Sequence, residues 1–390
     1  MKIADELFAR SAEGPLSGIV VADFGRVLAA PYCTMLLADM GATVLKVESP
    51  QGDETRSWMP PIFEGKSTYY LSVNRNKHSI ALDFRDHEDL LLAKKLAANC
   101  DILIENFKPG GLETYGLEYE SVATLNPSII YASVTGFGTA GGSDLPGYDL
   151  LVQGAAGLMS LTGSPETEPF RAGVAVFDVF TGLHTAIAVL AALNHRNATG
   201  EGQLVELNLM STALSSMVNQ TGACVIGGSV PTRLGNEHPS IYPYSPFPTS
   251  DGDIIFAIGN DKQFELFTKI INAESLMDDP RFQTNKSRSV NRDVLRPLLE
   301  NILQTRSTQE WFDEMRAAGL PAAPINTVAQ GIEFAKSIGL DPIVDVGTGE
   351  QSLPGVRNPV RFSKTPVSYD FAPPELNQDE QNIRAWLSSK

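Results

Sequence analysis

The residue with the clearest chemical potential is Asp178, an acid in an otherwise apolar stretch. The window 174–193, VAVFDVFTGLHTAIAVLAAL, consists almost entirely of apolar or small residues. A buried carboxylate without partners costs several kcal/mol or more. Two interpretations stay open. Asp178 caps a helix that begins beside Thr181 and Gly182, where its oxygens accept backbone N–H groups. Alternatively, the same N–H groups hold an ionised carboxylate in a dry pocket, ready to attack an acyl carbon.

The same window is long enough to resemble a membrane span. It contains Asp178, Gly182 and His184, which are poorly suited to a lipid environment. We therefore interpret it as a buried core helix preceded by a functional turn, and we expect no membrane association.

The motifs of other common sites are missing from the sequence. The turn after the first predicted strand, DFGRVLAAP at 23–31, contains only Gly25, so the GxGxxG of a dinucleotide-binding dehydrogenase is absent. The sequence also has no GxxxxGK[ST] and no HExxH, and its five histidines are scattered. We expect no metal site.

Composition bounds the class of protein. The 390 residues are 43% apolar and 19% charged, enough for a large core in two domains or one elaborated domain. A net charge of −16 without a block of like charges argues against nucleic acid as a partner. Three widely spaced cysteines and an acidic N-terminus, MKIADELFAR, favour a reducing compartment, the cytoplasm.

The elements that would position Asp178 follow an alternating pattern in the first half of the chain. Apolar runs predict strands at 18–24, 42–48, 78–84, 101–107 and 128–137, with helices at 31–41 and 86–98 between them. Such alternation predicts a mostly parallel, Rossmann-like, doubly wound α/β sheet covered by helices.

Later segments change in character. Residues 227–253 are rich in Pro, Gly and Ser and predict a long ordered connection. A strand at 254–259, helices near 261–272 and 294–304, and a capping box at Ser307–Glu310 follow. The predicted division is a large α/β domain over 1–227, a small α+β domain over 228–325, and a C-terminal segment over 326–390. That segment, with a strand at 358–364 and a helix near 375–388, returns to the large domain.

A series of motifs in order resembles the family III CoA-transferases, the group of formyl-CoA:oxalate CoA-transferase, carnitine CoA-transferase and α-methylacyl-CoA racemase. The resemblance covers residues ~15–370. It rests on segments 16–56, 74–83, 105–110, 133–138, 147–163, 171–193, 199–210 and 233–244.

In that family the aspartate of a GxxxxD element is the nucleophile, which here implies Asp178, five residues after Gly173. The resemblance implies an aspartyl–acyl mixed anhydride, then an aspartyl-CoA thioester, with neither a metal nor a tightly bound cofactor. Coenzyme A and acyl-CoA are substrates, small organic acids are acceptors, and the protein is an interlocked homodimer.

The resemblance also implies where coenzyme A lies. Contacts are expected at Val27, Leu28, Leu82, Arg85, Asn106 and Phe107. Lys108 is a further cation for the phosphates, and Gly136–Gly138 or Ile258–Asn260 could supply backbone donors to an oxyanion. Each of these residues is also compatible with a solvated surface or a simple turn.

Some positions depart from the family's best-known members. Ser49 and Thr114 replace arginines, Leu28 a glutamine, Phe137 a tyrosine that can face the active site, and Thr135 a lysine. These changes weigh against a specialist for oxalate or formate.

Substrate selectivity is expected from a second group of residues. Arg233 could bind the second carboxylate of a dicarboxylic acid such as succinate, and His238 could line the pocket, unless both only shape a loop. Tyr148 and Gln153 are expected near the pocket because they shortly precede Asp178 in the sequence.

Two rival functions stay open. A racemase of the same fold needs a histidine in a GHD motif, whereas this chain has Gly147-Tyr148-Asp149. A tyrosine with a pKa near 10 is a poor base near neutrality. In a non-catalytic CoA-binding module, Asp178 would be a helix cap only.

Overall fold

The computed structural model describes residues 8–390, which divide into two compact units. The first comprises the chain up to residue 158 together with 171–229 and 341–390, and the second comprises 159–170 and 230–340. The domain bounds that the sequence suggests, with a small domain over 228–325, stay a prediction.

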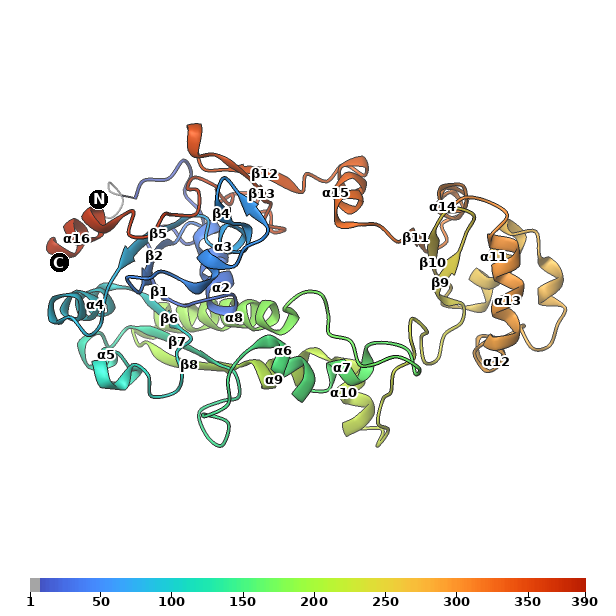
Figure 1. Cartoon of the computed structure of the whole chain (residues 1–390), viewed down its shortest axis with the longest axis horizontal. Coiled ribbons are helices and arrows are strands. Elements are labelled where there is room, and N and C mark those ends of the chain that lie inside the picture. The colour runs from blue at the N-terminus through green and yellow to red at the C-terminus, as the bar shows by residue number, and fades with distance from the viewer. Residues whose placement is uncertain (1–7) are drawn as a thin grey trace. The chain divides into compact units, whose positions relative to one another are not determined.

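A six-stranded parallel sheet forms the centre of the first unit (Figure 1). Its order is β5-β2-β1-β6-β7-β8. The strands are β1 (Val20–Phe24), β2 (Thr43–Glu48), β5 (Lys77–Ala81), β6 (Ile102–Glu105), β7 (Ile130–Thr135) and β8 (Gln203–Asn208). All five strands predicted from apolar runs are found. The sixth, β8, is only half-buried along most of its length, which explains why it lacks an apolar signature.

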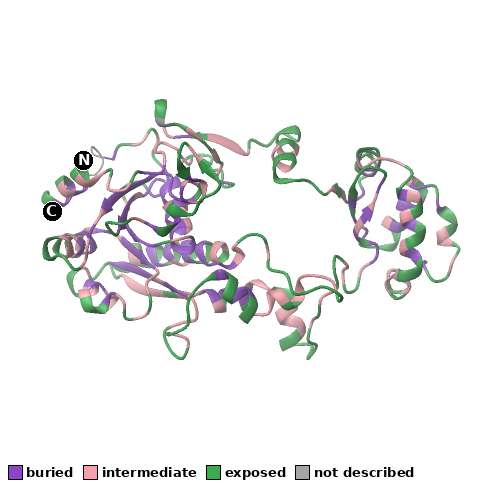
Figure 2. Ribbon diagram, viewed as in Figure 1, coloured by how far each residue is buried: buried purple, intermediate pink, exposed green. Residues whose placement is uncertain are grey.

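Helices cover both faces of this sheet. Helices α2 (Ala29–Asp39) and α8 (Val176–Thr199) pack on one face with Val21, Val44 and Ile104. On the opposite face, α4 (His87–Asn99), α5 (Tyr119–Leu125) and α16 (Glu380–Ser388) pack against residues that include Ala22 and Leu45. Figure 2 shows the strands buried between these layers. The predicted doubly wound α/β architecture is confirmed.

The strand order reverses between β1 and β6. From β1 the chain builds outward through β2 and β5, and it then returns to the other side of β1 for β6, β7 and β8. Ligands bind at such a switch point, beyond the carboxyl ends of the strands. The loops that follow β1 and β6 meet there, where the Arg26 N–H donates to Asn106 Oδ1 and Asn106 Nδ2 donates to the Arg26 carbonyl, both at 2.8 Å.

Shorter elements complete the first unit. They are η1 (Glu54–Ser57), β3 (Ile62–Phe63), β4 (Lys66–Ser67), α3 (Thr68–Val73), η2 (Glu113–Tyr115), α6 (Asp149–Ala155), α9 (Leu209–Ser216), α10 (Val218–Val225), β12 (Ile343–Val346), η4 (Gly349–Gln351) and β13 (Leu353–Val356). Helix α7 (Leu158–Leu161) lies where the chain passes from the first unit to the second.

The strand predicted at 358–364 is wrong, because the chain there is irregular and the hairpin β12–β13 lies upstream. Asn358 Oδ1 accepts the Val360 N–H at 3.0 Å, a side-chain turn that competes with strand pairing. Its amide also donates to buried Asp39 at 3.1 Å.

The second unit has its own core. An antiparallel sheet of β9 (Tyr244–Pro248), β10 (Asp253–Ala257) and β11 (Ala322–Pro324) packs aromatic residues such as Phe247, Phe256 and Trp311. Its helical elements are α11 (Asp261–Ile270), η3 (Glu274–Met277), α12 (Asn285–Val290), α13 (Arg292–Leu303), α14 (Thr308–Ala317) and α15 (Val328–Ser337). The predicted capping box of Ser307 and Glu310 starts α14.

Candidate active site

Asp178 lies in the first turn of α8, and its side chain does not cap that helix. The helix begins at Val176, before the predicted start beside Thr181, with Ala175 at the N-cap position. The cap comes instead from Asp149 of α6, whose Oδ1 accepts the N–H groups of Phe177 at 2.8 Å and Asp178 at 3.2 Å. The interpretation of Asp178 as a cap is therefore wrong: another carboxylate already binds the N–H groups it would accept.

Gln153 holds Asp149 and the segment before α8 in place through its side-chain amide. Its Nε2 donates to Asp149 Oδ2 at 2.5 Å and to the Val174 carbonyl at 3.3 Å, and its Oε1 accepts the Ala172 N–H at 2.8 Å. Both Gln153 and Asp149 are buried. The segment leading into α8 is thus fixed to α6, and with it the position of Asp178.

The Asp178 carboxylate itself is half-buried and accepts no hydrogen bond from the residues that the structure describes. Burial and the nearby negative charge of Asp149 raise its pKa from 3.8 to about 7. A carboxylate that lacks stabilising donors is a better nucleophile than a solvated one. Strongly perturbed acids of this kind are typical of functional sites.

A pocket of about 170 Å³ opens in front of Asp178. Its lining includes residues that were singled out from the sequence, among them Val27, Leu28, Asn106, Phe107, Lys108 and Tyr148. It lies at the switch point between β1 and β6, so residues far apart in the sequence converge there.

A neighbouring pocket of about 480 Å³ continues past the ends of β2 and β5 and shares Arg26, Glu54 and Phe107 with the first. Leu82 and Arg85, both predicted contacts, line it. The Arg26 guanidinium lies 5.4 Å from the centre of the Phe107 ring. Together the two pockets form a long recess with cations and aromatic rings along its walls.

The exit of β7 is shaped by two glycines that touch. A Cβ on Gly136 would lie 2.3 Å from the Gly147 Cα, so any larger residue would separate the loop before α6 from the sheet. Gly136 also lines the Asp178 pocket. The Gly138 N–H donates to Thr135 Oγ1 at 3.1 Å, and Phe137 packs against an apolar cluster; neither residue lines the two pockets described above.

Arg233 and His238 belong to the second unit. Arg233 Nε donates to the Ser164 carbonyl at 3.1 Å, and the Ser240 N–H donates to His238 Nδ1 at 3.1 Å. In the Ile258–Asn260 segment, the N–H groups of Ile258 and Gly259 already donate to Pro243 and to Gln263. Those two donors are not free for an oxyanion.

Sequence reasoning missed Asp149, Arg26, and the buried pair Lys46 and Asp53, whose side chains are fully buried and 3.0 Å apart. A signal for the pair was present, because a lysine inside the apolar strand 42–48 needs a buried acid. Asp149 carried no such signal, since its contact with α8 spans 28 residues. Among residues 8–390, no group of three or more His, Cys, Asp or Glu side chains could hold a metal ion.

Comparison with known proteins agrees with this site. The family model described as CoA-transferase family III matches residues 16–380. The chain belongs to CoA-transferase family III. It is 40% identical to a succinate–glutarate CoA-transferase of Agrobacterium fabrum, with 96% of each chain covered. A succinyl-CoA:glutarate CoA-transferase of Mus musculus is 39% identical, with 95% of this chain and 85% of that protein covered.

Solved structures give the same assignment. A CaiB/BaiF family protein from Brucella suis is 42% identical and superposes with a TM-score of 0.88, covering 96% of this chain and 100% of the other. The class predicted from the sequence, an acyl-CoA:carboxylate CoA-transferase, is confirmed by membership in CoA-transferase family III.

Proposed function

We propose that this CoA-transferase exchanges coenzyme A between small dicarboxylic acids of four or five carbons, with Asp178 as the nucleophile. The observation that carries the proposal is a half-buried carboxylate that accepts no hydrogen bond from any residue of 8–390 and faces a pocket at the switch point of the sheet. The relatives named for succinate and glutarate support the substrate class.

The chemistry proceeds through covalent steps at the carboxyl group of Asp178, beginning with one of its oxygens. This oxygen attacks the thioester carbon of the donor acyl-CoA, and the C–S bond breaks to give an aspartyl–acyl anhydride and CoA thiolate. The thiolate then attacks the aspartyl carbonyl and releases the donor acid. The acceptor carboxylate attacks the resulting aspartyl-CoA thioester, whose C–S bond breaks to give an aspartyl–acceptor anhydride and CoA thiolate. The thiolate finally attacks the acceptor's acyl carbon, which forms the new acyl-CoA and releases the free Asp178 carboxylate. Each step exchanges one acyl bond for another, so no redox partner is required.

The recess supplies what these steps need. Arg26, Arg85 and Lys108 provide positive charge for the phosphates of coenzyme A, and Phe107 provides an apolar wall. Leu28 and Ala29, at the start of α2, line the pocket in front of Asp178, and no side chain of the described residues caps this helix. Their backbone N–H groups are our candidates for stabilising the oxyanions.

Selectivity for dicarboxylates requires a cation for the second carboxylate, and Arg233 stays our candidate for that role. The protein acts as a homodimer in this proposal. One face of α8 exposes Phe180, Leu183 and Ile187, at 38%, 37% and 65% of their surface, which is the kind of apolar surface that a partner covers.

The decisive test offers succinyl-CoA together with glutarate and follows glutaryl-CoA by mass spectrometry. Hydroxylamine added during turnover should convert residue 178 to a hydroxamate in wild type and not in Asp178→Asn, which should also lose transfer activity. Full transfer by Asp178→Asn would refute the nucleophile. Rapid α-deuteration of a chiral 2-methylacyl-CoA in heavy water, without CoA transfer, would identify a racemase instead.

A further inference from the structure

The turn between β1 and α2 has five successive backbone groups bound by side chains. The Gly25 N–H donates to Asp23 and the Gly25 carbonyl accepts from Lys46 Nζ, both at 2.9 Å. Asn106 binds both the N–H and the carbonyl of Arg26. The Val27 N–H donates to Asp53 Oδ2 at 3.3 Å. These side-chain partners together hold the turn in one conformation.

The residue that these contacts hold in an unfavourable backbone conformation is Val27. Its φ angle is +66°, in the left-handed region that a β-branched residue normally avoids. Such a conformation persists only where the surrounding structure over-determines it, and it is found most often at functional sites. Val27 lines the pocket of Asp178.

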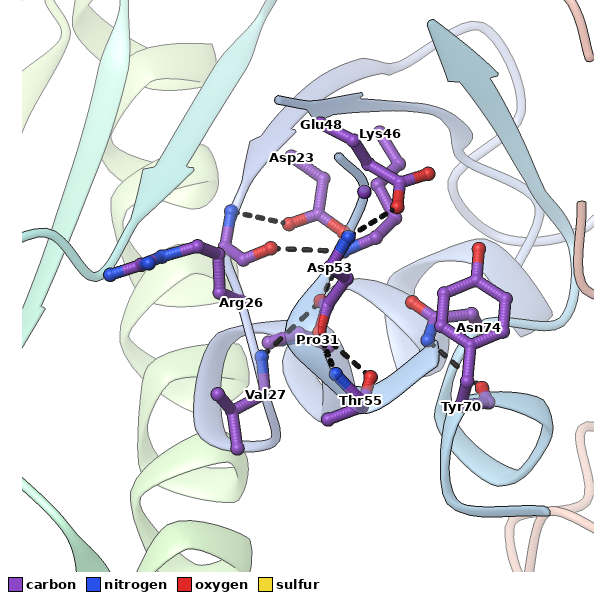
Figure 3. Close-up of polar contacts among 12 residues, drawn as sticks. Asp23, Arg26, Val27, Pro31, Lys46, Glu48, Asp53, Thr55, Tyr70 and Asn74 are labelled. Carbon is purple, nitrogen blue, oxygen red and sulfur yellow. Dashed lines mark hydrogen bonds and ion pairs between the residues drawn. The ribbon is translucent and has the colours of Figure 1, made fainter. Parts of the chain in front are cut away.

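The ion pair of Lys46 and Asp53 links the two ends of this turn, and we name the pair the Lys46–Asp53 clamp (Figure 3). Lys46 Nζ binds the Gly25 carbonyl on one side of the turn, and Asp53 Oδ2 accepts both Lys46 and the Val27 N–H on the other. Thr55 secures the second oxygen of Asp53 through its N–H and its hydroxyl, at 3.0 and 2.7 Å.

A buried ion pair is a poor device for stability alone, because desolvation offsets most of the attraction. A buried ion pair can, however, fix one conformation of the backbone groups that it binds. Here Asp53 also lines the neighbouring pocket, as do Lys46 and Arg26. The clamp therefore joins the walls of both halves of the recess.

We propose that the Lys46–Asp53 clamp is a positioning device that keeps the 25–28 turn, through the strained Val27, in the conformation that receives the CoA ester in front of Asp178. Neither side chain of the clamp is a catalytic residue. This inference rests on the proposed function for the chemistry at Asp178, but the binding of CoA tests it separately.

The test compares two buried aspartates. Asp53→Asn keeps the shape of the side chain but replaces one carboxylate oxygen with an NH2 group. Lys46 or Thr55 then faces a donor in place of the oxygen that accepts its hydrogen bond. Asp39→Asn is the matched control. Asp39 is equally buried, pairs with Arg75 at 2.7 Å, and lines neither half of the recess. We expect kcat/KM for succinyl-CoA to fall at least ~10-fold in Asp53→Asn, with the KM for the acceptor acid unchanged. Asp39→Asn should stay within ~3-fold of wild type at equal folded fraction.

Val27→Gly provides a second variant that does not depend on the folding of an ion-pair mutant. Glycine tolerates the left-handed φ, so this variant should keep or raise the thermal midpoint while kcat/KM falls. The double variant Val27→Gly/Asp53→Asn should lose no more kcat/KM than Asp53→Asn alone, since both changes release the same turn. Additive losses, or equal losses in Asp53→Asn and Asp39→Asn, would overturn the proposal.

Calorimetric titration with coenzyme A alone separates this proposal from the assignment of Asp178. The Kd should rise about as much as kcat/KM falls in Asp53→Asn, with no chemistry involved. An unchanged Kd would also overturn the role of the clamp. Full transfer activity in Asp178→Asn would instead refute the nucleophile and leave the titration result standing.

Discussion

At the scale of single residues, the properties of Asp178 follow from what surrounds its carboxylate. Burial and the charge of Asp149 raise its pKa to about 7, so roughly half of the molecules carry the ionised nucleophile at neutral pH. We expect kcat/KM for acyl-CoA to increase as the pH rises through about 7 and to level off above it. A pH–rate profile of the wild-type enzyme measures this, and a flat profile between about pH 5 and pH 8 would contradict it.

Asp149→Asn tests the cause of that shift. The amide oxygen can still accept the N–H groups at the start of α8, but the like charge beside Asp178 is gone. The apparent pKa of the pH–rate profile should move to lower pH, because an ionised neighbour no longer disfavours the Asp178 carboxylate. A profile that keeps its midpoint would mean that burial alone sets the pKa.

The same pKa makes a prediction about stability. The folded state binds a proton at Asp178 more tightly than the unfolded state, whose carboxyl titrates near 3.8. The unfolding free energy should therefore fall between about pH 4 and pH 7 on account of this group and stay lowered above that range. Asp178→Asn, which carries no charge, should be more stable than wild type by ~1–3 kcal/mol at about pH 8.

Urea denaturation at two pH values checks this prediction. The stability gain of Asp178→Asn should be clear at about pH 8 and small at about pH 4, where wild-type Asp178 is protonated. Equal stabilities at the higher pH would show that the carboxylate is solvated.

At the scale of elements, the approach of α8 to α2 brings the nucleophile to its pocket. A Cβ on Gly182 would lie 2.6 Å from the Ala29 carbonyl oxygen, which belongs to the first turn of α2. Gly182→Ala should push the helices apart and cost ~1–3 kcal/mol of stability, with a loss of kcat because Asp178 lies one turn away. Urea unfolding and steady-state kinetics measure both effects.

Gly331 in α15 provides the matched helical control. Apart from its two chain neighbours and the backbone of its own helix, no described atom lies within 4 Å of the Cβ that alanine would add there. Gly331→Ala should gain up to ~1 kcal/mol from helix propensity and leave kcat unchanged. If Gly182→Ala behaved in the same way, close helix packing would not be what positions Asp178.

The sequence predicted elements best where local pattern and burial agree. The apolar runs that become β1, β2, β5, β6 and β7 are buried between two layers of helices. A short apolar run of this kind is stable as a central strand of such a sheet, which is what the pattern predicts. The segment 358–364 has a strand-like pattern. The Asn358 side chain, however, accepts the Val360 N–H in a local turn and donates to Asp39. The contact with Asp39 spans 319 positions and has no local signature, whereas the turn has one in the dipeptide Asn358-Pro359.

The site divides in the same way. Asp178 was detectable because an acid in an apolar window needs an explanation, and the loop residues Val27, Asn106 and Phe107 came from the family resemblance. The capping of α8 by Asp149 and the closure of the recess by Lys46 and Asp53 are tertiary contacts. The sequence carries no signal for the cap by Asp149, whereas a lysine inside the apolar strand 42–48 indicates the need for a buried acid.

At the scale of the whole molecule, the exposed face of α8 is the feature that calls for a partner. By length and composition α8 is apolar enough to cross a membrane, yet 44% of its apolar window is buried inside the protein. We expect a homodimer in light scattering at micromolar concentration. Ile187→Glu, at a position with 65% exposure, should shift the mass toward that of a monomer.

Leu125→Glu is the control for this prediction. Leu125 is exposed at 56% but lies in α5, on the opposite face of the sheet. Its substitution should leave the mass of the particle unchanged. A wild-type protein with the mass of a monomer would contradict the prediction that a partner subunit covers the exposed face of α8.

The burial of Lys46 has a consequence for an enzyme whose substrates are acylating agents. Thioesters and anhydrides react with unprotonated amines to form permanent amides, which would poison a site that must regenerate a free carboxylate. Burial would lower the pKa of Lys46, but Asp23, Asp53 and Glu48 more than reverse this and raise it. Lys46 is thus both enclosed and held as an ammonium ion, and the amine at the floor of the recess is protected from the reagent that the protein handles.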